Sequence, residues 1–178
     1  MMDLARHPWA RDGVRMPRDV LAKIEAHALE AYSLGPDAEG EEACGVVAGP
    51  ATDLVADATE RIPNLANRYH RLDPEGYPRT GRTYFLINPL EFSRRIEAAE
   101  KAGRPVKVLY HSHLDCGAYF SPTDVDTALA GGSEPSYDLA FLVVSVRGDG
   151  QGGGAHCDDR KLFVWSGTAF VEAPLVLF

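Results

Sequence analysis

Apolar residues recur along the chain with two different spacings, one typical of helices and one typical of strands. A first helical pattern has Pro17 in its first turn and is expected to end near Gly35-Pro36. A second begins at Pro89 and stops at Gly103. The sequence therefore predicts a helix at each of these two places.

Short apolar or β-branched runs between turn residues predict the strands of a sheet. The run at 139–146 is strongly apolar and is expected to be a central strand. The tail, 173–178, is also apolar and is expected to add an edge strand or to pack against a partner. The remaining strands are predicted at residues 43–49, 53–62 (one strand or a pair), 83–87, 106–110, 161–165 and 168–171.

Two long segments show neither spacing. Residues 1–16 are mostly polar, and we expect them to form a loosely held lead-in. Residues 64–82 are rich in Asn, Arg, Pro and Gly, and a loop of this length in a compact domain is usually functional or disordered. The whole chain, 1–178, is long enough for one domain with a substantial core and short for two. A single domain is therefore expected.

Composition and charge narrow the class of protein. Hydrophobic residues make up 45% and charged residues 25%, which is ordinary globular usage. The net charge of -8 and the lack of a basic run argue against nucleic acid as a partner. No stretch approaches the ~20 apolar residues of a membrane span, and no signal-peptide core is evident. Three cysteines make a poor disulfide framework, so we expect a reducing, cytoplasmic location with no membrane contact.

The predicted strand at 106–110 runs into a histidine pair that carries the candidate chemistry. His111 and His113 are two residues apart, so on an extended strand both side chains point the same way. Ser121 is a good helix N-cap, and Asp124 falls in the first turn of that helix. Two imidazoles and one carboxylate form a three-ligand set that leaves one position of a zinc ion open for water. The sequence therefore predicts a catalytic Zn²⁺ site.

Hydrolysis at such a site needs further groups from the chain. Zinc lowers the pKa of water from ~15.7 to ~7, which makes it a nucleophile at neutral pH. A carboxylate that is not a ligand would move the proton, and Glu42 is the candidate. Glu41 is its immediate rival, and spacing alone does not choose between them. The Ser121 hydroxyl could donate to the oxyanion, although without neighbouring ligands it would be only a helix cap.

Other residues have simpler interpretations. A His-x-His pair alone is a weak signal, because two strand histidines can be ordinary polar groups at a sheet edge. His27 is a lone helical histidine, which is more often packing or surface than a ligand. Cys116 lies between the ligands, but a fourth protein ligand would close the site to water. The His-Cys-Asp run at 156–158 has no partner set. Zinc deaminases need His-x-Glu and Pro-Cys-x-x-Cys, which this sequence lacks.

The spacing of these residues resembles a known signature. Glu42, then His111-x-His113, seven residues, Ser121, two residues and Asp124 is similar to the JAMM signature of MPN+ zinc metalloproteases. The Glu-Ala-Cys-Gly segment is similar to the pattern around that family's catalytic glutamate, which favours Glu42 over Glu41. The resemblance implies that the two histidines and the aspartate bind zinc while the serine assists the oxyanion.

The same resemblance carries expectations for fold and activity. It implies a cytidine-deaminase-like α/β fold, with a curved mixed β-sheet and flanking helices. The chain resembles the stand-alone bacterial JAB-domain proteins in particular. This resemblance implies a peptidase or isopeptidase that cuts after the C-terminal Gly-Gly of a ubiquitin-like or sulfur-carrier protein. Residues 64–82 could then form one wall of the tail channel.

Some questions stay open at this point. Leu114 stands where proline often follows the second histidine in the family, which leaves loop shape and substrate choice undecided. The alternatives are a non-catalytic MPN-type scaffold that binds proteins and a zinc amidase of small molecules. A homo-oligomer is compatible with the apolar tail.

Overall fold

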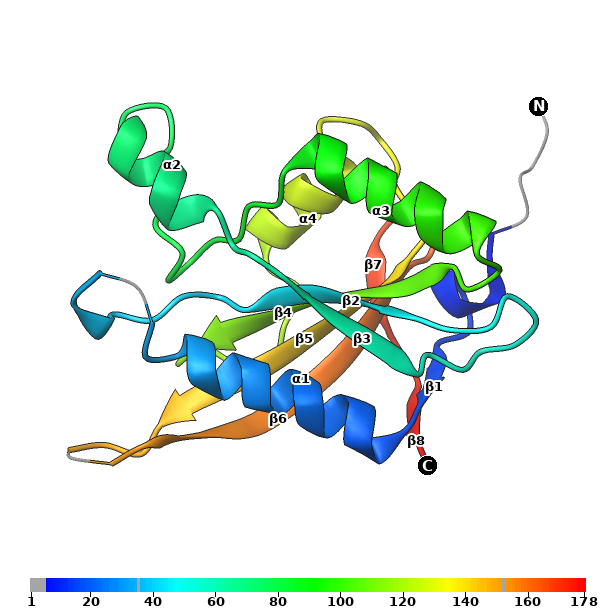
Figure 1. The fold of residues 1–178 in the computed structure, drawn as a ribbon, viewed down its shortest axis with the longest axis horizontal. Helices are drawn as coiled ribbons and strands as arrows, with labels where there is room; N and C mark the ends of the chain where they lie inside the picture. Colours follow the sequence, from blue (N-terminus) through cyan, green and yellow to red (C-terminus); the bar gives the residue numbers. More distant parts are fainter. Residues whose placement is uncertain (1–5, 35, 152) are drawn as a thin grey trace.

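A six-stranded mixed sheet forms the centre of the protein (Figure 1). The structure is a computed structural model that describes residues 6–34, 36–151 and 153–178. The strand order is β3-β2-β4-β5-β6-β7, in which β4 and β5 are parallel and the other neighbours antiparallel. The strands are β2 (Cys44–Ala48), β3 (Ala58–Ile62), β4 (Val106–Leu114), β5 (Ala140–Gly148), β6 (Ala155–Trp165) and β7 (Phe170–Ala173).

Helices cover both faces of this sheet, as predicted. Helix α1 lies along one face, whereas α3 and α4 lie on the other, and α2 projects beyond the end of the sheet (Figure 1). The mixed sheet with flanking helices confirms the predicted α/β fold class. No helix in the described ranges is long and apolar enough to cross a lipid bilayer. The α-helices are α1 (Arg18–Ala31), α2 (Ala66–Leu72), α3 (Pro89–Lys101) and α4 (Pro122–Leu129), and short 3-10 turns occupy Pro8–Ala10 and Pro36–Ala38.

The side chains of β4 alternate between two apolar layers. Val108 and Tyr110 pack into the layer beneath α1, with Leu142 of the neighbouring strand. Leu109 belongs to the opposite layer, which contains Phe92 of α3. Because strand side chains alternate between faces, the histidines that continue β4 lie on the α3 and α4 side. The fold thereby determines which face carries the candidate site.

The prediction of a loosely held lead-in over 1–16 is wrong for residues 6–16. Trp9 and Met16 are buried in the layer beneath α1. Strand β1 (Val14–Met16) pairs in parallel with β8 (Leu175–Leu177), so the two ends of the chain form a separate two-stranded sheet. Residues 1–5 lie outside the described residues. The apolar tail therefore forms a strand, but it pairs with β1 instead of extending the main sheet.

Met16→Ala is expected to lower the free energy of unfolding by roughly 2–5 kcal/mol, because it empties a fully buried site that cannot collapse easily. Arg18→Ala, two residues later and exposed, is the matched control and should change it by less than ~0.5 kcal/mol. Urea denaturation of both variants measures the difference. Equal stabilities would mean that the β1 segment does not contribute to the core.

The predicted loop over 64–82 contains a helix. Helix α2 (Ala66–Leu72) occupies its first half, while the remainder is irregular. Only Ala66 of this helix is buried, so the apolar pattern that identifies a helix in sequence is missing. The first helix also differs slightly, since α1 ends at Ala31 with Tyr32 as its C-cap. The expected stop at Gly35-Pro36 falls partly outside the described residues, because Gly35 is not described.

Residues 83–87 were predicted as a strand, and they form none. Here an asparagine side chain forms backbone hydrogen bonds of the kind that a neighbouring strand would form. The Asn64 amide donates to the carbonyl oxygen of Tyr84 (2.9 Å) and accepts from the Leu86 amide (3.0 Å). The same amide donates to the Glu42 carbonyl oxygen (3.0 Å). The Leu65 amide also donates to the Leu86 carbonyl oxygen (2.8 Å), so Asn64 and its neighbour together hold the segment, and a propensity-based prediction cannot detect such contacts.

Candidate metal centre and active site

His111 and His113 lie side by side on β4, in the interior of the sheet. Both are buried, at 1% and 3% exposure, and their Nε2 atoms are 3.1 Å apart. Phe85 stacks on the His111 ring, with 4.7 Å between the ring centroids. The His113 Nδ1 donates to the carbonyl oxygen of Gly117 (2.8 Å), which leaves Nε2 with a lone pair facing its neighbours. The strand thus presents both imidazoles in a fixed orientation.

Asp124 reaches the same point from the start of α4. The Ser121 Oγ accepts from the Asp124 amide (3.1 Å), and the Asp124 Oδ2 accepts from the Ser121 amide (2.8 Å). This reciprocal capping box confirms the predicted helix start and fixes the carboxylate. Its oxygens lie 3.1 Å from the His111 Nε2 and 3.2 Å from the His113 Nε2. A local rule of helix capping therefore completes the three-residue group.

The group fits a divalent metal ion by both geometry and chemistry. The candidate ligand atoms of His111, His113 and Asp124 lie within 4.8 Å of one another, and all three residues are buried. Two neutral imidazoles with one carboxylate are the donors that zinc accepts in catalytic sites. Burial raises the pKa of Asp124, but in the metal-free protein the charge of His111 and the hydrogen bonds from both histidines and the Ser121 amide lower it overall, which keeps an anionic ligand available. These residues are therefore suited to hold a metal.

Glu42 is placed beside the histidines by the pairing of β2 with β4. Cys44 pairs with His111, and Ser112 exchanges hydrogen bonds with Ala43 through its amide (2.9 Å) and hydroxyl (2.8 Å). Continuing this antiparallel register puts Glu42 opposite His113, on the same face of the sheet. The Glu42 side chain is 5% exposed. Burial, and then the nearby Asp124 carboxylate, raise the pKa of Glu42 well above its usual value.

Glu41, the rival candidate, points elsewhere. Its Oε2 accepts from the Asn67 side-chain amide of α2 (3.1 Å). Its side chain is partly exposed, whereas that of Glu42 is buried. The register therefore distinguishes two adjacent glutamates that sequence spacing could not.

Ser121→Ala is expected to lower the free energy of unfolding by about 1 kcal/mol, because the Asp124 amide loses its acceptor at the start of α4. Ser121→Asn should restore most of that loss, since asparagine caps helices as well as serine does. Thermal unfolding of the three proteins measures the effect. An alanine variant as stable as the parent would contradict the capping role.

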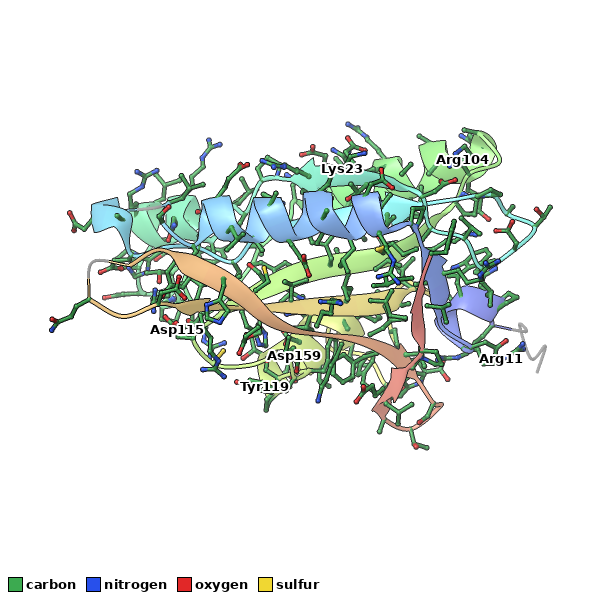
Figure 2. All side chains as sticks on the ribbon, turned by 90° about the horizontal axis from the view of Figure 1, so that it is seen from below. Arg11, Lys23, Arg104, Asp115, Tyr119 and Asp159 are labelled. Atoms are coloured by element: carbon green, nitrogen blue, oxygen red, sulfur yellow. The ribbon has the colours of Figure 1, made fainter. Side chains whose placement is uncertain are left out.

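The structure brings together some of the predicted residues and leaves others apart. His27 shares a hydrogen bond with the Tyr110 hydroxyl (2.8 Å) on the α1 side of the sheet, and its role there is packing. Cys116 is exposed in the loop after β4 and is not one of the clustered ligands. In Figure 2, Tyr119 of that loop lies on the side of the sheet away from α1, whereas Asp115 accepts a hydrogen bond from the hydroxyl of Tyr32, the C-cap of α1 (2.8 Å).

The His-Cys-Asp run at 156–158 is part of β6 and does not gather a metal-like group within the described ranges. Because side chains alternate between the two faces of a strand, His156 and Cys157 point in opposite directions. His156 pairs with Asp149, while the Cys157 thiol points to the Glu25 carbonyl oxygen of α1 (3.8 Å).

A cavity beside the candidate metal centre was not predicted from the sequence. It measures about 470 Å³, and His111 and Asp124 are among its lining residues. Arg79, from the loop after α2, donates to the Thr123 hydroxyl at its edge. The only local signal was the density of arginines in 64–82, which does not reveal where any one of them points.

The chain is similar to known proteins over most of its length. The family described as prokaryotic homologs of the JAB domain matches residues 17–155. The chain is 33% identical over 129 residues to proteins of Mycobacterium bovis and Mycobacterium tuberculosis named CysO-cysteine peptidase, covering 72% of this chain and 70% of each relative.

Two solution structures share the fold. A protein of Desulfitobacterium hafniense has a TM-score of 0.58 at 20% identity, and a protein of Salinibacter ruber has 0.56 at 23%. Each alignment covers 93% of this chain and 92% of the other.

Proposed function

Because this chain belongs to the family of prokaryotic JAB-domain proteins, we propose that it is a zinc-dependent peptidase that hydrolyses the amide of a sulfur-carrier protein conjugate. The observation that carries the proposal is the buried group of His111, His113 and Asp124, whose ligand atoms lie within 4.8 Å of one another. A scaffold that only binds partners has no need for such a group. The peptidase named among the relatives supports the choice of an amide as the bond cleaved.

The three clustered residues would hold the zinc ion. When bound, zinc would supply a Lewis acid that makes water nucleophilic at neutral pH and polarises a carbonyl group. The contribution of the chain is to fix the two imidazoles on β4 and the carboxylate at the start of α4. The bond from His113 to the Gly117 carbonyl oxygen keeps the metal-facing nitrogen unprotonated.

Glu42 would move the proton. Its carboxylate lies opposite His113 and is not one of the clustered ligands, so it is free to accept a proton from the attacking water. Its raised pKa then suits the return of that proton to the leaving nitrogen, because a weaker acid holds the proton between the two steps. An amine leaves far more readily once its nitrogen is protonated.

Ser121 would stabilise the oxyanion. Its Oγ accepts from the Asp124 amide at 3.1 Å, so the hydroxyl proton can be donated elsewhere. A donor aimed at the carbonyl oxygen of the scissile amide stabilises the charge that develops there. One serine would therefore cap the helix and assist the reaction.

The substrate class follows from the relatives and the surroundings of the site. The relatives are named CysO-cysteine peptidase, so the name gives CysO as one part of the substrate and cysteine as the other. We infer a conjugate of the same kind here, in which a ubiquitin-like carrier tail is joined to an amino acid or short peptide. The segment 64–82, tied to α4 by Arg79, would form one wall of the tail channel.

The zinc-loaded protein should hydrolyse a CysO–cysteine conjugate, with mass spectrometry detecting free carrier and free amino acid. Treatment with a chelator should stop the reaction, and added zinc should restore it. Failure to hydrolyse the conjugate, or hydrolysis that continues in the chelator, would overturn the proposal.

A further inference from the structure

The cavity beside the metal centre is large enough to hold part of a substrate. Its volume of about 470 Å³ lies in the range of roughly 300–1,000 Å³ found for small-molecule sites. His111 and Asp124 are among its lining residues, and most of the others are apolar. Several of the lining residues are aromatic: Tyr84, Phe85, Phe92, Phe120, Tyr137 and Phe141.

Arg79 contacts a residue of the cavity wall. It donates to the Thr123 hydroxyl, and Thr123 lines the cavity next to Asp124. Its charge also reaches two neighbours, since it acts to lower the pKa of Glu42 and that of Tyr84, both of which burial raises. Across the ranges that the structure describes, no carboxylate forms an ion pair with Arg79.

Arg79 and the apolar cavity together suit a ligand that carries a carboxylate next to an apolar group. A guanidinium presents five donors in a planar fork that matches a carboxylate, and the bond to Thr123 uses only part of it. In an amide formed by an amino acid, the α-carboxylate lies two bonds from the amide nitrogen. The side chain starts from the same α-carbon. One residue can therefore present both groups beside the bond that is cut.

We propose that Arg79 and this cavity recognise the amino acid on the leaving side of the scissile amide, by its free α-carboxylate and a large apolar side chain. This inference rests on the proposed function and adds the identity of the leaving group. Hydrolysis adds one water across the amide, so that the carrier gains a carboxylate and the amino acid gains the proton on its nitrogen. The small side chain of cysteine would leave most of the cavity unfilled, so the preferred residue differs from that of the relatives.

Binding of three small probes to the full, zinc-loaded chain tests this without relying on turnover. The probes are N-acetylglycyl-L-phenylalanine, its carboxamide and N-acetylglycyl-L-alanine, titrated by NMR. The phenylalanine acid should bind roughly 10- to 100-fold more tightly than its carboxamide, which lacks the charge for the guanidinium. It should also bind at least about tenfold more tightly than the alanine acid, because only phenylalanine fills the apolar body.

Two variants assign the carboxylate preference to its residue. Arg79→Gln should bring the affinities of the acid and the carboxamide to within about threefold of each other. Arg82→Gln is the matched control, since Arg82 lies in the same loop but contacts Asp115 (3.1 Å) and should leave the ratio unchanged. The ratio of the acid and carboxamide affinities is compared because Arg79 also affects Glu42. Both probes bind the same variant, so an effect on Glu42 that is common to both cancels in the ratio.

The outcomes separate this inference from the proposed function. Equal affinity for acid and carboxamide, equal affinity for phenylalanine and alanine, or no binding of any probe would overturn the inference. Selective binding as described, in a protein that leaves both the CysO–cysteine and the CysO–phenylalanine conjugates intact, would support the recognition site and reject the peptidase. Hydrolysis of either conjugate without probe selectivity would do the reverse.

Discussion

Glu42→Gln is expected to lower the rate of conjugate hydrolysis by about 10²- to 10⁴-fold while leaving the metal content unchanged. Glutamine has nearly the same shape and fills the same buried position, but it cannot accept a proton. Because Glu42 is not among the clustered ligands, its loss should not release the metal. Steady-state rates and elemental analysis of the purified variant measure both effects.

The control and the pH dependence sharpen this prediction. Glu41→Gln should retain nearly full activity, because Glu41 faces Asn67. A base works only when ionised, and burial raises the pKa of Glu42. Activity of the parent should therefore fall with decreasing pH at a point above the usual range of a glutamate, and Glu42→Gln should lack this step. Equal losses in the two glutamine variants would contradict the assignment of the base.

His113→Ala is expected to weaken zinc binding by at least about 100-fold and to abolish hydrolysis at limiting metal. Changes to residues that merely orient a ligand cost 10- to 100-fold in metal affinity, and this substitution removes the ligand itself. The remaining His111 and Asp124 cannot hold the ion in a three-ligand site. Zinc titration against a competing chelator measures the affinity.

His156→Ala is the matched control for that variant, because His156 is exposed and pairs with Asp149 away from the site. It should bind zinc like the parent. Circular dichroism verifies that His113→Ala is folded. A folded variant with unchanged zinc affinity would exclude His113 as a ligand.

The sequence predicted the core of the site because two local rules apply there. A strand turns every second side chain to one face, which placed His111 and His113 together. The Ser121 cap, with proline at the next position, located the start of α4 and therefore Asp124. Neither rule depends on distant parts of the chain. The choice of Glu42 over Glu41 needed the family resemblance, and the pairing of β2 with β4 provides its physical reason.

The features that the sequence did not reveal all depend on contacts between distant segments. Strand β1 forms because β8, at the other end of the chain, pairs with it. Residues 83–87 have the composition of a strand, yet they form hydrogen bonds with the Asn64 side chain and the Leu65 amide, and no strand partner exists for them in the described structure. The cavity has lining residues from α3, α4, β4 and β5, and Arg79 reaches its edge from the loop after α2. The spacing of apolar residues along the sequence carries no information about contacts between distant segments.

The most direct test of the account is to measure conjugate hydrolysis as zinc is added to metal-free protein, with the bound zinc counted in the same samples. The account predicts a rate that starts near zero, rises in proportion to bound zinc and stops rising at one ion per chain. Full activity in metal-free protein, or one bound zinc ion per chain with no hydrolysis of any carrier conjugate, would contradict it.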